Sequence, residues 1–159
     1  MTLGELKKLT QEIVSEARRL SAAHTNEGDA PVNYACIFAQ SQAEYENMVV
    51  LAGQLGTVVE GTPMGPVFHI TPLPTDAGML RLLKIRHPDP KRPERGDADF
   101  TVSDYQTFKR TYLGKPGFGL IERKHMEMIE LFDPSFNVLA YYSHPPLADV
   151  LKIDLFKTL

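Results

Sequence analysis

Short apolar segments separated by turn-forming residues dominate residues 34–142 and leave few folds open to the chain. Runs of four to eight residues alternate with clusters rich in Gly, Pro and Asp, such as Gly61–Pro66 and Asp133–Ser135. Segments of this length with such boundaries are typical of β-strands. The predicted strands are residues 34–39, 57–60, 67–71, 79–86, 99–102, 118–123, 126–132 and 137–142.

Two helical patterns interrupt these strands. Ser41 is the predicted N-cap of the first helix, with Glu44 at the capping-box spacing and Gly56 just beyond its end. Ser103 is the predicted N-cap of the second helix, which is predicted to end before Gly114. We therefore predict an α+β fold: a curved, mainly antiparallel sheet of six to seven strands, two helices packed on one side, and an N-terminal accessory helix.

The accessory helix is predicted over residues 2–22. Its apolar residues recur at spacings of three and four, and Thr2 can act as N-cap with Glu5 three residues later. The stretch 21–33 has the composition of a loop, so we divide the chain into residues 1–25 and a single α+β domain, 34–159. The narrow apolar stripe fits docking on that domain or pairing with a second copy, which would make a homo-oligomer.

Near the C-terminus, the pattern of residues 147–156 fits either a short helix or an extended tail.

Composition narrows the class of protein. With 159 residues and 43% apolar content, the chain can bury one sizeable core. Its 17 basic and 20 acidic residues give a net charge of −3, which argues against nucleic acid as a partner. No apolar run has the length of a membrane span, and the N-terminus lacks the apolar stretch of a signal peptide. We therefore expect a cytoplasmic protein without a membrane partner, in which the single cysteine, Cys36, is a buried thiol.

The specific catalytic and cofactor motifs are absent. The sequence contains no GxxxxGK[ST], GxGxxG after a strand, CxxC, HExxH, GxSxG or EF-hand loop. It resembles no family at the level of a motif, shows no internal repeat and indicates no cofactor. Functional residues must therefore be sought among local concentrations of ionisable side chains.

The densest concentration lies at residues 84–99, which include three prolines. A loop stiffened by proline can hold side chains in fixed directions at low entropic cost. Arginine side chains there can grip a carboxylate or phosphate, and a histidine titrates near neutrality. The alternative is a solvated loop whose charges pair with one another. The predicted ligand-binding residues are Lys84, Arg86, Arg92, Arg95 and Asp97, and the predicted catalytic residues of this segment are His87 and Asp99.

Asp97 and Asp99 form the most specific pattern in this segment. In extended backbone, residues two apart point to the same side, so both carboxylates can face one centre. A divalent metal would require a third ligand, which the sequence does not identify. Because Gly-Asp pairs are also common turn formers, no metal site is predicted.

A second concentration lies on the predicted strand 126–132 and the residues before it. Continuous alternation would place His125 and Glu127 on one face, where the carboxylate would raise the pKa of the imidazole. Such a pair suits general acid–base catalysis, which makes both residues catalytic candidates; a cross-strand salt bridge is the alternative.

These observations predict a domain that binds, and in an enzymatic form transforms, a small anionic metabolite in a cleft between the 84–99 loop and the 123–130 strand. The alternative is a protein-interaction or oligomerisation module without catalytic activity, which acts through the N-terminal helix. Both predictions depend on how the fold arranges segments far apart in the sequence.

Overall fold

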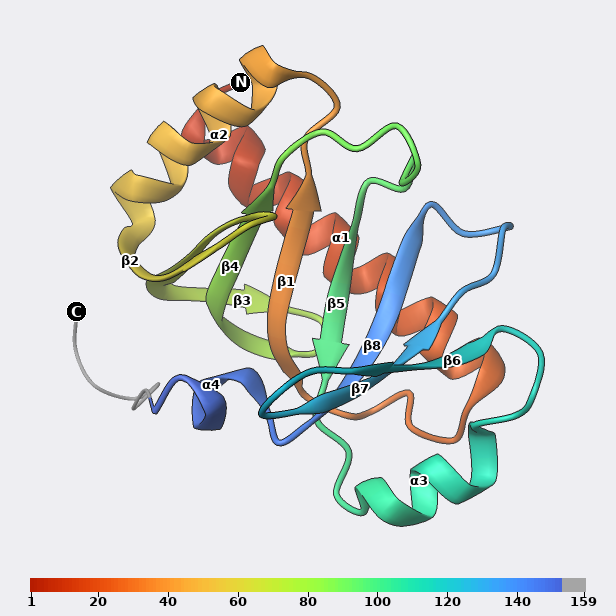
Figure 1. The fold of residues 1–159 in the computed structure, drawn as a ribbon. Coiled ribbons are helices and arrows are strands. Elements are labelled where there is room, and N and C mark those ends of the chain that lie inside the picture. The colour runs from red at the N-terminus through yellow and green to blue at the C-terminus, as the bar shows by residue number, and fades with distance from the viewer. Residues whose placement is uncertain (153–159) are drawn as a thin grey trace.

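The computed structural model describes residues 1–152 and forms one continuous eight-stranded sheet with four helices in that range (Figure 1). The strands are β1 (Val32–Phe38), β2 (Gly56–Thr62), β3 (Gly65–Thr75), β4 (Gly78–Arg86), β5 (Gly96–Phe100), β6 (Phe118–Glu122), β7 (Glu127–Leu131) and β8 (Val138–His144). The helices are α1 (Leu3–His24), α2 (Gln42–Leu55), α3 (Tyr105–Tyr112) and α4 (Leu147–Val150).

The sheet consists of two halves with the same order of elements. Its strand order is β2-β3-β4-β1-β5-β8-β7-β6. Each half runs strand, helix, then three strands, and its last strand returns to pair in parallel with its first, β4 with β1 and β8 with β5. The halves meet where β1 and β5 pair antiparallel. The two halves therefore repeat the same order of elements, although the sequence shows no internal repeat.

Helices α1, α2 and α3 cover one face of this sheet. In Figure 1, α1 runs behind the central strands. Its buried residues Leu6, Ile13 and Leu20 belong to a core that also contains Ala35, Ile37, Leu83 and Ala98 from the sheet. Thr2 and Glu5 form a complete capping box at its start, as predicted. The apolar stripe of α1 is therefore buried against the sheet of the same chain.

Gly96 marks the close approach of α1 to β5. A Cβ atom at this position would lie 2.9 Å from Ile13 Cδ1 and closer still to the carbonyl oxygen of Cys36. Only glycine leaves room there for the helix to pack against the strand. The short linker 25–31 then brings the chain from α1 into β1.

The opposite face of the central strands has a smaller core. Alternate residues of β1, Tyr34, Cys36 and Phe38, cluster there with Leu139 and Tyr141 of β8. Ala148 of α4 packs on the same cluster. All but the first residue of β1 are buried, because both faces of this strand are covered.

The predicted fold class is confirmed, with several boundaries corrected. Five of the seven strand pairings are antiparallel, and the sheet has eight strands where six to seven were expected. Asp104, and not Ser103, caps α3. Residues 147–150 form α4, while residues 153–156 of the predicted C-terminal segment lie outside the described residues. Within residues 1–152, none of the helices is long and apolar enough to cross a membrane.

Candidate ligand-binding cavity

A cavity of about 500 Å³ opens on the sheet face that lies opposite α1, and we call it the sheet-face cavity. Its floor is formed by side chains from β1, β4, β5 and β8, the four central strands: Tyr34, Cys36, Lys84, Arg86, Asp97 and Tyr141. Thr62, Pro63 and Met64 form one wall at the turn between β2 and β3. The β6–β7 hairpin and residues 147–151 form the others. The cavity therefore lies at the junction of the two halves of the sheet.

The centre of the floor is a row of three residues on adjacent strands. Cys36 of β1 pairs in register with Lys84 of β4 on one side and with Asp97 of β5 on the other. Residues in register on neighbouring strands project to the same face of the sheet. The row therefore places a primary amine and a carboxyl group on either side of a thiol.

Asp97 is the most unusual group in this row. Its side chain is 5% exposed, and Oδ1 is buried without a hydrogen-bond partner among the described residues. Burial raises the pKa of Asp97 to about 8, with a further increase from Asp99, while the positive charge of Lys84 opposes the shift. A buried acceptor without a partner costs about 1–3 kcal/mol, so its retention calls for an explanation.

Asp99, two residues further along β5, has a different environment. Its Oδ1 accepts a hydrogen bond from the Ser143 backbone N–H at 2.9 Å, and its Oδ2 accepts one from Asn33 Nδ2 at 3.3 Å. Burial raises the pKa of Asp99 to about 7, and these hydrogen bonds oppose the shift. Asp99 therefore links β5 to β8 and to β1, and it is not among the residues that line the cavity.

Cys36 is buried between the two charged residues of the row, in agreement with the predicted buried thiol. Burial and the neighbouring Asp97 raise the pKa of its thiol well above the ordinary value. The protonated thiol contributes a small apolar surface to the floor of the cavity.

The cavity is rich in basic side chains. Lys84, Arg86, Arg92, Arg123 and Lys124 line it, against the carboxyl groups of Glu60 and Asp97. Two of the arginines are held by carboxylates outside the lining: Arg86 Nη2 lies 3.0 Å from Asp89 Oδ2, and Arg92 Nη2 lies 3.1 Å from Glu130 Oε2. Among the ion pairs of residues 1–152, none involves Lys84, Arg123 or Lys124.

Apolar side chains make up much of the remaining wall. They include Met126 and Met128 of the hairpin, Val67 of β3 and Leu147 at the start of α4. Methionine side chains adapt their shape to varied apolar surfaces. The sheet-face cavity therefore combines apolar walls with cationic groups, which fits an anion that carries an apolar body.

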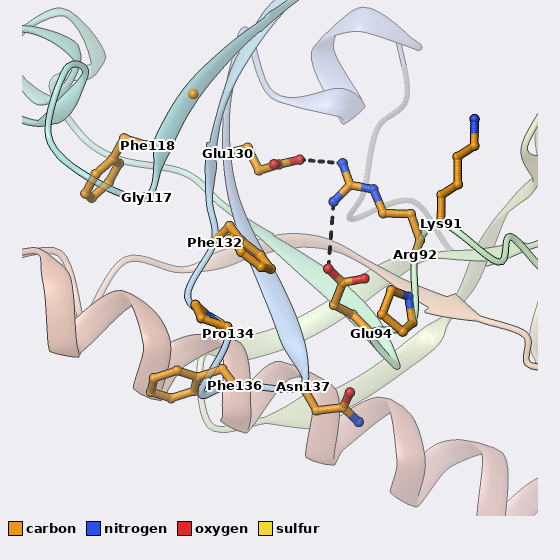
Figure 2. A pocket seen from close by; sticks show the side chains of 12 residues that line it. Lys91, Arg92, Glu94, Gly117, Phe118, Glu130, Phe132, Pro134, Phe136 and Asn137 are labelled. Carbon is orange, nitrogen blue, oxygen red and sulfur yellow. Dashed lines mark hydrogen bonds and ion pairs between the residues drawn. The ribbon is translucent and has the colours of Figure 1, made fainter.

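A second concavity, the outer groove, has a volume of about 660 Å³ and lies beside the β7–β8 turn (Figure 2). Its apolar residues are Phe118, Phe132, Pro134 and Phe136. Figure 2 shows Arg92 between the carboxylates of Glu130 and Glu94, so three of the four charged side chains that line the groove pair with one another, and Lys91 is the fourth. Phe132 is exposed at its rim. Internal pairing leaves this groove less suited to a charged ligand than the sheet-face cavity.

The structure brings five of the nine predicted site residues to the sheet-face cavity. They are Lys84, Arg86, Arg92, Asp97 and His125. The segments 84–99 and 123–130 thus contribute to the lining of one concavity, although they are separated by α3 and β6 along the chain. Their roles toward a ligand stay predictions.

Two residues of the loop lie elsewhere. Arg95 Nη1 and Nη2 contact the two carboxylate oxygens of Glu44, at 2.6 and 3.0 Å, and so tie the loop to α2. The imidazole of His87 stacks on the Tyr45 ring with 3.9 Å between ring centroids. Both side chains therefore hold the loop against α2 and are not among the residues that line the cavity, and their predicted roles toward a ligand stay predictions.

The predicted His125–Glu127 pair does not form. β7 begins at Glu127, and residues 124 and 125 lie in the turn of the hairpin, so strand alternation does not extend back to His125. His125 lines the cavity, whereas Glu127 Oε2 accepts hydrogen bonds from the Tyr105 hydroxyl at 2.8 Å and Lys109 Nζ at 2.7 Å. These contacts lower the pKa of Glu127 and fasten α3 to the sheet.

Several residues of the site were not among the sequence candidates. Tyr34, Glu60 and Met128 line the cavity, and Tyr141 does so while its hydroxyl donates to Glu130 Oε2 at 2.7 Å. The alternation of Tyr34, Cys36 and Phe38 was the available signal, because it marks a second buried face on β1. No three His, Cys, Asp or Glu side chains of residues 1–152 form a cluster that could hold a metal ion.

Comparison with known proteins supports the fold alone. No family model and no curated protein matches the sequence. A solved structure described as "Structural Genomics, Protein EC4020" superposes with a TM-score of 0.67 and 14% sequence identity, covering 89% of this chain and 91% of that chain. The fold of this chain therefore resembles that of EC4020.

A second solved structure is similar at a lower level. It is a glyoxalase/bleomycin resistance protein/dioxygenase superfamily member from Vibrio splendidus 12B01, with a TM-score of 0.44 and 10% identity over 72% of this chain and 97% of that chain. At this level the likeness carries no functional argument.

Proposed function

We propose that this chain binds a small organic anion with an apolar body in the sheet-face cavity. The observation that carries the proposal is a contrast of charge: five basic and two acidic side chains line the cavity of a chain whose net charge is −3. An excess of side chains of one charge in a partly enclosed space concentrates the electrostatic field there and attracts a ligand of opposite charge.

Lys84 is the central cation of the proposed site. It lies at the floor, next to Cys36 in register, and among the described residues it forms no ion pair that would compete with a ligand. The apolar walls, which include Met126, Met128 and Leu147, would cover the body of the ligand. A charge-assisted hydrogen bond and apolar burial would then both contribute to affinity.

The proposal is tested by the binding of two ligands with the same chain length and opposite charge. Decanoate should bind saturably in isothermal titration calorimetry, and decyltrimethylammonium should not. Lys84→Met, which keeps the length of the side chain, should weaken decanoate binding by about tenfold, because a hydrogen bond to a charged group contributes roughly 1.5–3 kcal/mol.

Lys8→Met is the matched control, since Lys8 is an exposed residue of α1, on the other side of the sheet. This variant removes the same charge and should bind decanoate within about twofold of the wild type. Equal binding of the two ligands, or equal weakening by the two substitutions, would refute an anion site at this cavity.

The alternative function, an interaction module that acts through α1, receives less support. The buried residues of α1 already pack on the sheet of the same chain. Pairing of α1 with a second copy would have to use its polar side or displace it from this core. Assembly through α1 stays a prediction that the mass of the protein in solution tests.

A further inference from the structure

Asp97 lines the sheet-face cavity, and one oxygen of its carboxyl group, Oδ1, is buried without a hydrogen-bond partner among the described residues. Asp97 is among the lining residues, its side chain is 5% exposed, and its Oδ1 accepts no hydrogen bond from the described residues. Nearly all buried polar atoms in proteins find a partner in protein, water or ligand. Asp97 therefore borders the cavity with a carboxyl group that the protein itself does not fully satisfy.

The neighbouring residues show that the fold can satisfy a carboxylate on this strand. Both oxygens of Asp99 have donors, from Ser143 and Asn33. At Asp97, the adjacent positions in register are Cys36 and Leu139, which offer no strong donor. Of the two carboxyl groups on β5, only the one that borders the cavity thus lacks a partner for a buried oxygen.

We infer that the ligand of this cavity is a hydroxylated organic anion, whose hydroxyl group binds Asp97 while its anionic group is held by the basic side chains of the lining. The inference rests on the proposed function and adds a second polar group to the ligand. It assigns Asp97 as the residue that selects for this group.

A hydroxyl fits the position better than an ammonium group does. Lys84 lies two strands away in the same row, and its positive charge would repel a second cation. A hydroxyl carries no net charge, donates to an ionised carboxylate and accepts from a protonated one. The raised pKa of Asp97, about 8, means that both forms occur near neutral pH, and a hydroxyl can bind either form.

A site that hydrogen-bonds a ligand hydroxyl discriminates against the analogue that lacks it, because the buried protein group is then left without a partner. The test uses two matched pairs of ligands with different apolar bodies: 3-hydroxydecanoate with decanoate, and 3-phenyllactate with 3-phenylpropanoate. We expect the wild-type protein to bind the hydroxylated member about tenfold more tightly, or better, in at least one pair.

Two substitutions of Asp97 then test the assignment. Asp97→Leu should reduce the preference for the hydroxylated member to about one and should bind decanoate at least as tightly as the wild type, because no acceptor remains unpaired. Asp97→Asn keeps a hydrogen-bonding side chain of the same shape and should retain part of the preference. It also keeps the test decisive if the leucine variant fails to fold.

Glu94→Gln is the matched control. Glu94 is 7% exposed and also has a buried carboxylate oxygen without a partner, but it lines the outer groove and not the sheet-face cavity. This substitution should leave the preference unchanged.

The outcomes separate the two claims. If decanoate binds but hydroxylated and unhydroxylated anions bind equally in both pairs, Asp97 is satisfied by water alone and this inference is wrong, while the proposed function stands. The same holds if Asp97→Leu keeps the full preference. If none of the four anions binds, the proposed function fails and this inference fails with it.

Discussion

Asp97 and Asp99 lie two residues apart on β5 and pair in register with Cys36 and Tyr34 on the same side of β1, yet only Asp99 has hydrogen-bond partners for both oxygens. The two carboxyl groups share a strand, a face and deep burial. They differ because Asp97 borders the sheet-face cavity, whereas Asp99 accepts a hydrogen bond from the Ser143 backbone N–H. The sequence Asp-Ala-Asp thus holds one carboxyl group that links strands and one that lines the cavity.

This difference predicts opposite effects on stability. Asp97→Leu should raise the free energy of unfolding by about 1 kcal/mol, because it removes a buried acceptor that has no partner. Asp99→Leu should lower it by about 1–3 kcal/mol, because the Ser143 N–H and the Asn33 amide lose their acceptor. Urea-induced unfolding of both variants shows whether each substitution raises or lowers the free energy of unfolding. Equal losses in the two variants would show that Asp97 is as well satisfied as Asp99.

The raised pKa values predict that stability falls as the pH rises toward 8. The pKa of Asp97 is about 8 in the folded state, against an ordinary value of 3.8, and that of Asp99 is about 7. Between these limits the folded protein binds more protons than the unfolded chain, so the free energy of unfolding decreases with increasing pH. Asp97→Asn should make the decrease between about pH 5 and 8 shallower. We would measure the free energy of unfolding in urea for the wild type and Asp97→Asn across this pH range. The same pH dependence in both proteins would contradict the buried environment assigned to Asp97.

Arg95 should be important for stability and not for ligand binding. Its two contacts with Glu44 lower the pKa of that carboxyl group and hold the 87–95 loop on α2. Arg95→Met should lower the free energy of unfolding by about 1 kcal/mol, since the pair is partly solvent-exposed. It should leave decanoate affinity within about twofold. A tenfold loss of decanoate affinity without loss of stability would show that Arg95 contributes to ligand binding after all.

The packing of α1 predicts that its apolar residues stabilise this chain rather than an assembly. Ile13 is 2% exposed and belongs to the main core, so Ile13→Ala should lower the free energy of unfolding by about 2–5 kcal/mol. Val50 of α2 is 63% exposed, and Val50→Ala should change it by less than about 0.5 kcal/mol. If Ile13→Ala instead dissociates an oligomer at unchanged monomer stability, α1 packs between copies.

The sequence was informative where local rules decide structure. The capping box of Thr2 and Glu5 and the cap formed by Ser41 with Glu44 mark helix starts that the structure confirms. Strand positions followed from apolar runs between turns, and the α+β class followed from the strands and helices together. The pairing of β1 with β4 and β5 joins segments about fifty to sixty residues apart, and no local pattern specifies it.

The composition of the site was harder to predict for the same reason. Lys84, Asp97 and His125 were found because charged residues cluster in the sequence. Arg95 and Glu127 belong to the same clusters, but they face α2 and α3, and sequence clustering cannot tell one side of a segment from the other. Tyr34 has no ionisable neighbours in the sequence, and Met128 lies within the second cluster but carries no ionisable group, so neither was a candidate.

The most direct test of the account is the location of the anion on the folded protein. Backbone amide chemical shifts would be assigned by NMR and followed during a titration with decanoate. The account predicts saturable shifts at the floor and walls of the sheet-face cavity, at Lys84, Asp97, Met128 and Tyr141. Shifts confined to the outer groove, at Phe118, Phe132 and Phe136, or none at all, would contradict it.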